Sequence, residues 1–137
     1  MKVLVSACLL GENCKYNGGN NRDEKVLAFL ADKEVVAVCP EKALGIPRTP
    51  MEIVDGVLIN KDGVVVDHVV RAAMDQILQQ LKTEPVDMAI LKSRSPTCGV
   101  RQIYDGTFSG KLIDGSGVLA QALQAAGIPT VDAEQLP

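Results

Sequence analysis

Two apolar runs separated by an amphipathic segment constrain the fold of this chain most strongly. "KVLVSA" (2–7) and "EVVAVC" (34–39) are continuous, rich in β-branched residues and of strand length, which is typical of buried strands. The segment 22–32 between them places four apolar side chains toward one side, as an amphipathic helix does: Val26, Leu27, Phe29 and Leu30. A strand, a helix and a second strand in this order predict a parallel α/β sheet.

The rest of the chain continues this alternation. The segment 51–66 ("MEIVDGVLINKDGVVV") predicts a β-hairpin, with its turn at 60–63. A helix over 67–82 follows, with Asp67 as its N-cap. "VDMAILKS" (86–93) predicts the third core strand.

The last third of the chain predicts one more helix and strand. We interpret the glycine-rich segment 104–117 ("YDGTFSGKLIDGSG") as a structural turn that leads into a helix over 116–126. "IPTVDA" (128–133) predicts a fourth short strand. Because no repeat or linker divides the chain, we expect a single α/β domain over 1–137. Its mostly parallel sheet is flanked by helices in a Rossmann-like three-layer arrangement, with a small β-hairpin.

Composition excludes several functional classes. At 137 residues and 47% hydrophobic, the chain can bury a core without disulfide staples. Its net charge of -3, with both signs mixed along the chain, argues against nucleic acid as a bulk partner. No apolar run approaches the ~18 residues of a membrane span, and the apolar part of the N-terminus is too short for a secretory signal. We therefore expect a cytoplasmic protein without a membrane partner.

The four cysteines, Cys8, Cys14, Cys39 and Cys98, carry the functional interpretation. In a reducing cytoplasm they favour ligands, reactive thiols or small core residues over disulfides. Cys8 lies just beyond the first predicted strand, Cys39 ends the second, and Cys98 follows the third. Because the loops beyond the carboxyl ends of parallel strands converge on one crevice, we expect these three cysteines to meet there.

Three interpretations of this trio remain open from the residues alone. The cysteines can be small core residues at strand ends. They can be zinc ligands, although structural zinc requires a fourth ligand. The single histidine, His68, begins a predicted helix and is a surface residue in this interpretation, not that ligand. They can also hold a 4Fe-4S cluster through three thiolates, which leaves one iron open. Cys14, in a polar turn, is either a fourth ligand or a nearby free thiol, and we favour three ligands with Cys14 outside.

Four ordered segments resemble the DUF523 family: "VSACLLGENCKYNGG", "VCPE" followed by "PRTPMEI", "LKSRSPTCG" and "IYDGTFSGKLIDGSGVLAQAL". Its characterised members are iron-sulfur-dependent thiouracil desulfidases. The resemblance implies a 4Fe-4S cluster held by Cys8, Cys39 and Cys98, with its fourth iron open to the substrate sulfur. It further implies Glu41 as a catalytic acid/base and Ser95 as a catalytic serine.

The implied activity is removal of sulfur from a small thiolated pyrimidine, of thiouracil or thiouridine type, with water and with release of sulfide. The competing hypothesis is a non-catalytic iron-sulfur or zinc module that senses sulfur species. A weaker third hypothesis is a thiol redox protein that uses Cys8 and Cys14. The further candidates for the site are Arg48, Arg94, Lys92 and Ser93, and the sequence does not determine the oligomeric state.

Overall fold

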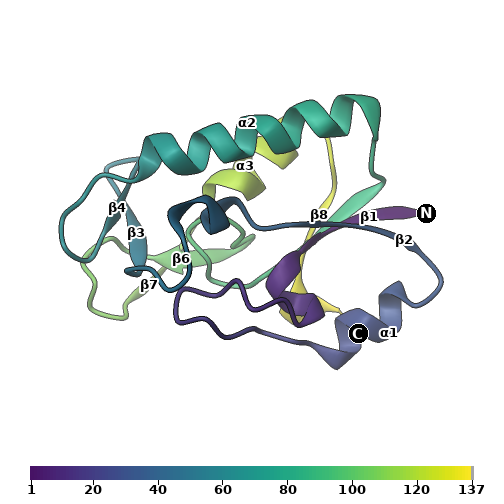
Figure 1. Ribbon diagram of the computed structural model, residues 1–137, viewed down its shortest axis with the longest axis horizontal. Helices are drawn as coiled ribbons and strands as arrows, with labels where there is room; N and C mark the ends of the chain where they lie inside the picture. The colour runs from purple at the N-terminus through teal and green to yellow at the C-terminus, as the bar shows by residue number, and fades with distance from the viewer. Residues whose placement is uncertain (137) are drawn as a thin grey trace.

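A four-stranded parallel sheet forms the centre of the protein, whose computed structural model describes residues 1–136 (Figure 1). Its strands, in spatial order, are β2 (Glu34–Val38), β1 (Lys2–Ser6), β5 (Met88–Leu91) and β8 (Thr130–Asp132). Every neighbouring pair is parallel. The predicted parallel α/β sheet is therefore confirmed, with strands that end one or two residues before the apolar runs do.

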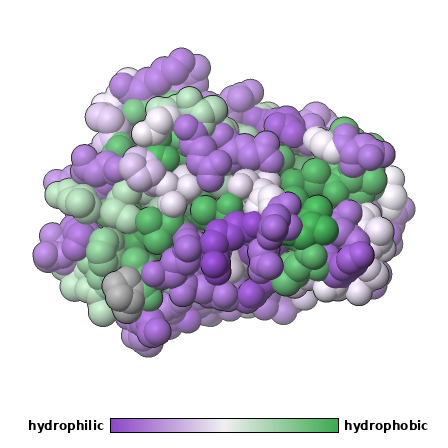
Figure 2. Space-filling view, turned by 180° about the vertical axis from the view of Figure 1, so that it is seen from behind, coloured by the Kyte–Doolittle hydropathy of each residue, from purple (hydrophilic) through white to green (hydrophobic). Residues whose placement is uncertain are grey.

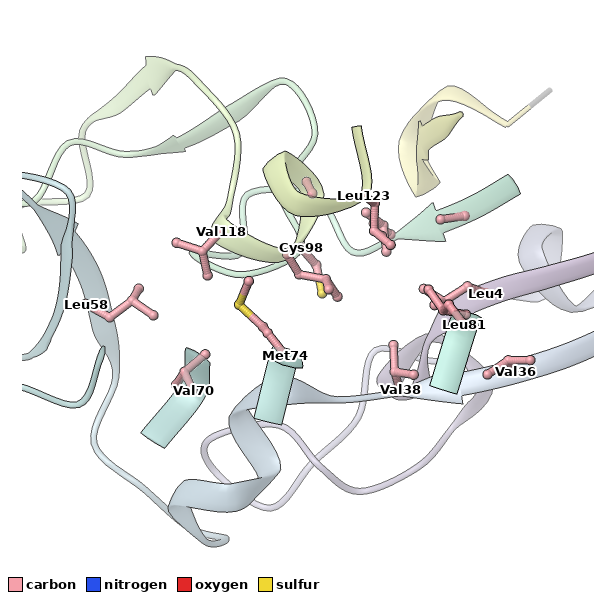
Figure 3. Close-up of a cluster of buried hydrophobic side chains, with 14 of the residues drawn as sticks. Leu4, Val36, Val38, Leu58, Val70, Met74, Leu81, Cys98, Val118 and Leu123 are labelled. Carbon is pink, nitrogen blue, oxygen red and sulfur yellow. The ribbon is translucent and has the colours of Figure 1, made fainter. Parts of the chain in front are cut away.

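Helices cover both faces of this sheet, as the predicted three-layer arrangement requires. The helix α1 (Glu24–Leu30) packs on the face that receives Val3 and Val5 of the central strand. The helices α2 (Asp67–Thr83) and α3 (Val118–Ala125) cover the other face, which receives Leu4. Figure 3 shows this second core, in which side chains of α2, α3 and the sheet converge around Met74 and Cys98.

The helix starts differ in detail from the prediction. The carboxylate of Asp23 accepts hydrogen bonds from the amides of Lys25 and Val26, so α1 begins later than residue 22. The prediction of Asp67 as an N-cap is wrong, because Val66 occupies that position. Asp67 is the first helical residue, and its carboxylate instead accepts the Leu58 amide at 3.0 Å, which ties α2 to the neighbouring strand.

The predicted β-hairpin exists, but its turn lies elsewhere. Strands β3 (Met51–Val54) and β4 (Val57–Asn60) pair antiparallel around Asp55 and Gly56, whose φ angles are 50° and 78°. Two successive positive φ values define the tight primed turn that Asp-Gly favours, so this dipeptide and not 60–63 makes the hairpin. The segment 60–63 forms a second turn, which returns the chain to a bridge between Ile59 and Val65.

The interpretation of 104–117 as a plain turn is also wrong. Strands β6 (Gln102–Tyr104) and β7 (Leu112–Asp114) form an additional antiparallel hairpin there. The carboxylate of Glu52 organises its loop by accepting the amides of Gly106 at 2.9 Å and Phe108 at 3.2 Å. Two three-residue strands in a segment with four glycines carry too little apolar alternation to be recognised from the sequence.

The surface is mixed in character. Figure 2 shows hydrophilic side chains over much of the face opposite to that of Figure 1, with hydrophobic side chains gathered in separate groups. Within residues 1–136, no helix is both long and apolar enough to cross a membrane.

Candidate active site

The carboxyl ends of β1, β2 and β5 open on one cavity of about 430 Å³. Cys8 lies in a 3-10 helix (Ala7–Leu10) directly after β1, and Cys39 follows β2. Cys98 lies in the loop after β5. All three line the cavity, so the structure brings together the cysteines that the strand-end argument selected.

All four cysteines are free thiols, and their surroundings disfavour the thiolate form of three of them. Burial raises the pKa of the Cys8 thiol, although a hydrogen bond with Asn21 opposes the shift. Burial also raises the pKa of the Cys98 thiol to about 12, against opposing hydrogen bonds with Ser6 and Thr97. These thiols are therefore protonated at neutral pH, so binding a metal group through them must release protons.

Cys14 also lies at this cavity, beside Cys39, although the sequence placed it outside the ligand set. It is 1% exposed, and burial together with the neighbouring Cys39 raises its pKa to about 12. Its carbonyl oxygen lies 3.9 Å from Cys39 Sγ and accepts a hydrogen bond from Arg48 Nη2 at 2.8 Å. The structure thus makes Cys14 part of the cavity wall, next to one of the three predicted ligands.

The loop that carries Cys98 is fixed by the Ser95 side chain. Ser95 Oγ accepts the backbone amides of Thr97 at 3.2 Å and Cys98 at 3.0 Å. The Ser95 carbonyl accepts the amide of Gly99 at 2.8 Å, which closes the turn. Ser95 therefore has a structural role, in addition to whatever chemistry its hydroxyl performs.

The N-terminus of α3 also holds this loop, through backbone hydrogen bonds. The carbonyl of Pro96 accepts the amide of Val118 at 3.0 Å. The carbonyl of Thr97 accepts the amides of Leu119 at 2.9 Å and Ala120 at 3.1 Å. These three bonds satisfy amides that a helix start leaves without intrahelical partners, and they anchor the loop to the core.

Glu41, which follows β2, contacts this loop at the cavity. It lies in the first turn of a 3-10 helix (Pro40–Leu44), and its side chain is 17% exposed. Its Oε2 accepts the Thr97 hydroxyl at 2.7 Å and lies 3.3 Å from Ser95 Oγ. The structure therefore brings together the two residues predicted to be catalytic, Glu41 and Ser95, and adds Thr97 between them.

Arg48 is more deeply placed than its sequence context indicated. Its side chain is only 8% exposed, and its guanidinium donates to the carbonyls of Cys14 and Gly45. The same guanidinium lies 3.8 Å from Glu41 Oε1. A buried arginine that joins the Cys14 segment to the Glu41 helix positions two walls of the cavity at once.

The remaining candidates divide into those at the cavity and those away from it. Lys92, Ser93 and Arg94 line it, but Ser93 bonds the buried carboxylate of Asp132 and Arg94 pairs with Glu134. His68 is exposed on α2 and does not line the cavity.

Thr97 is the residue that the sequence analysis missed. It is fully buried, and it contacts Glu41, Ser95 and the Cys98 thiol. Its place next to Cys98 was the only available signal, because Glu41 lies 56 positions earlier in the chain.

Comparison with known proteins shows the family to which this chain belongs. The sequence profile of the 2-thiouracil desulfurase family matches residues 3–135, so the chain belongs to this family. The resemblance to the DUF523 desulfidases drawn from the motifs is thereby confirmed.

Two individual relatives cover nearly the whole chain. The uncharacterized protein YbbK of Bacillus subtilis (strain 168) is 36% identical over 146 residues, which span 98% of this chain and 97% of YbbK. The solved structure of TudS (DUF523Vcz), a 4Fe-4S-dependent thiouracil desulfidase, matches with a TM-score of 0.90 at 32% identity. The match covers 99% of this chain and 93% of that chain.

The donor set at the cavity fits an iron-sulfur cluster. Such clusters are held by cysteine thiolates, and thiols arrive here from three separate strand ends. Cationic side chains at the same cavity, Arg48 and Lys92, offset the negative charge that thiolates bring. Among residues 1–136, no three His, Cys, Asp or Glu side chains are placed to hold a single metal ion.

Proposed function

We propose that this protein is a 4Fe-4S cluster-dependent desulfidase that replaces the sulfur of a thiolated pyrimidine by oxygen from water and releases sulfide. Membership of the 2-thiouracil desulfurase family and the similarity to TudS support this activity. The observation that carries the proposal is the meeting of three strand-end cysteines with Glu41 and Ser95 at one cavity. The reaction is a hydrolysis, so it requires no electron donor and no organic cofactor.

We assign Cys8, Cys39 and Cys98 as the residues that hold the cluster. They come from three strand ends that the sheet fixes in register, which keeps the thiols in place before a metal group binds. When bound, the cluster supplies Lewis acidity toward the soft thiocarbonyl sulfur.

We assign Glu41 as the general base that takes a proton from the attacking water. Its carboxylate lies at the cavity wall, where the hydroxyl of Thr97 and the guanidinium of Arg48 hold it in one orientation. General base catalysis needs the base within hydrogen-bond reach of the reacting proton, and a fixed carboxylate at the cavity meets that requirement.

We assign Ser95 as the group that supplies a proton to the pyrimidine ring nitrogen or to the departing sulfur. Its Oγ lies 3.3 Å from Glu41 Oε2, which places the hydroxyl beside the carboxyl group that accepts the proton of water. Atoms balance in this scheme, because one water enters, its oxygen becomes the carbonyl oxygen and sulfide leaves with the protons.

The substrate that we propose is a free base or nucleoside of thiouracil or thiouridine type. The cavity of about 430 Å³ falls within the range of small-molecule sites and is shared between the cluster and the substrate. A cytoplasmic location, predicted from the sequence, provides the reducing conditions in which thiols persist.

Anaerobic reconstitution followed by a sulfide-release assay tests the function. Protein loaded with iron and sulfide, and freed of excess sulfide, should convert 2- or 4-thiouracil into uracil with one sulfide per uracil. The E41Q variant should keep the cluster but lose about 10²- to 10⁴-fold in kcat, the usual contribution of general acid-base catalysis. The matched C98A variant should lose both cluster and activity.

The same assay separates the proposal from a non-catalytic cluster module. A loaded protein that releases no sulfide from any thiolated pyrimidine would favour the sensing module and overturn the enzyme. An E41Q variant with full activity would reject the role of Glu41 but leave the enzyme standing.

A further inference from the structure

The hydrogen bonds around Ser95 have only one consistent direction. A serine hydroxyl has two lone pairs and a single proton. Both lone pairs of Ser95 Oγ are occupied, because the oxygen accepts the amides of Thr97 and Cys98. A hydrogen bond between Ser95 Oγ and Thr97 Oγ1, which lie 3.0 Å apart, can therefore run only from Ser95 to Thr97. The other acceptor within reach of the Ser95 proton, Glu41 Oε2, is farther away, at 3.3 Å.

The Thr97 hydroxyl in turn has one proton and three neighbours. Glu41 Oε2 lies at 2.7 Å, a length typical of a hydroxyl bonded to a carboxylate, whereas the Cys98 sulfur lies at 3.6 Å. The proton of Thr97 therefore points to Glu41. Because Thr97 is fully buried, no solvent molecule competes for that proton.

We infer that Thr97 is a positioning residue that joins Ser95 to Glu41 in one directed chain, Ser95 to Thr97 to Glu41. The direct contact between Ser95 and Glu41, at 3.3 Å, is long for a hydroxyl donor. The two shorter links through Thr97, at 3.0 and 2.7 Å, are the route by which a proton passes between them. This inference rests on the proposed function and deepens it.

The chain balances protons over one turnover. Glu41 takes a proton from water, and Ser95 gives its own proton to the substrate. Glu41 then passes its proton to Thr97 while Thr97 passes a proton to Ser95, so all three groups regain their starting state. The two amides that Ser95 accepts stabilise its oxygen during the interval in which it lacks a proton.

Kinetics of T97V and T97S test the chain in the cluster-loaded enzyme. T97V removes the hydroxyl and keeps the shape, and it should lower kcat by about tenfold or more with KM changed less than about threefold. T97S keeps the hydroxyl and should restore most of the lost kcat, and both variants should hold as much iron as the wild type. A T97V enzyme with wild-type kcat would overturn the inference, as would a T97S enzyme as slow as T97V.

The double variant S95A/T97V separates a shared chain from two independent roles. If both residues act in one chain, the double variant should be no slower than S95A alone, because the chain is already broken. Losses in kcat that multiply would show separate actions and refute the chain. If T97V does not fold, T97A replaces it in the same comparison.

A stability measurement on the cluster-free protein tests the hydrogen bond between Thr97 and Glu41 without relying on activity. Urea midpoints of wild type, T97V, E41A and T97V/E41A form a cycle, in which the T97V shift should largely disappear when Glu41 is absent. Additive shifts would refute the link between the two side chains. A wild-type enzyme that releases no sulfide would refute the proposed function, whereas this cycle needs no cluster and still decides whether Thr97 contacts Glu41.

Discussion

Replacing Gly117 by alanine should displace the loop that carries Cys98. A Cβ atom at this position would lie 2.4 Å from the Thr97 carbonyl carbon, 2.5 Å from the Thr97 oxygen and 2.8 Å from the Cys98 nitrogen. Backbone atoms cannot rotate away as a side-chain end can. The φ and ψ of Gly117, -66° and 163°, suit alanine well, so the effect comes from the contact and not from backbone strain.

The size of the effect follows from what the displacement breaks. Forcing an extra carbon into a packed region costs about 1–3 kcal/mol. The shift also weakens the three bonds from the amides of Val118, Leu119 and Ala120 to the loop, each worth about 1 kcal/mol net. We therefore expect G117A to lower the free energy of unfolding by about 3–5 kcal/mol, or the melting temperature by roughly 10–17 °C for a chain of this size.

Thermal unfolding of the cluster-free protein and iron content after reconstitution measure the outcome. G115A is the matched control in the same loop, because its Cβ would meet only the end of the Ile103 side chain, at 3.2 Å. The control should unfold close to wild type and bind iron normally, whereas G117A should do neither. If G117A melts within about 2 °C of wild type and loads with iron as well, the loop is not braced against α3 as described.

Three further predictions concern the walls of the cavity. R48M should lower the free energy of unfolding of the cluster-free protein by about 1–3 kcal/mol, because the carbonyl of the buried Cys14 loses its donor; a loss below about 0.5 kcal/mol in urea unfolding contradicts this. C14A should bind as much iron and acid-labile sulfide as wild type, and a marked deficit would make Cys14 a fourth ligand. Burial raises the pKa of the Cys98 thiol from 9.0 to about 12, so the unfolded chain loses this proton first as the pH rises. The stability of the cluster-free protein should therefore be complete below pH 9 and fall between pH 9 and 12, by up to about 1.4 kcal/mol per pH unit from this thiol. C98A should show a shallower fall, and equal slopes would reject the assignment.

The sequence predicted the sheet well because its two central strands, β1 and β5, are buried on both faces. The run at 2–7 has no polar alternation, which is typical of a strand covered by helices on both sides. The run at 34–39 looks the same in the sequence, although β2 lies at the edge of the sheet and leaves Val35 and Ala37 exposed. Once the parallel sheet was inferred, the convergence of loops at its carboxyl edge placed Cys8, Cys39 and Cys98 at one rim. The structure confirms this placement at the cavity, although their role as ligands stays a prediction.

The two hairpins were harder because their stability comes from long-range contacts. The turn of the first hairpin was assigned to 60–63 although Asp55 and Gly56 carry an equally strong turn signal, and local sequence could not choose between two such turns. The second hairpin depends on Glu52, a residue more than fifty positions away from the loop amides that it binds. No local pattern reports such a contact.

Hydrogen-bond networks between side chains cannot be predicted from local sequence either, because their members lie far apart in the chain. Ser95 is an example. The resemblance implied a catalytic hydroxyl, but the structure gives its oxygen a second task, because it also holds the amide of Cys98. Removing this side chain should therefore disturb both the ligand loop and proton transfer. Removing the carboxylate of Glu41 leaves that loop's own amide bonds intact. It follows that E41Q isolates the chemistry of the site, whereas S95A mixes chemistry with cluster retention and is interpretable only beside measured iron content.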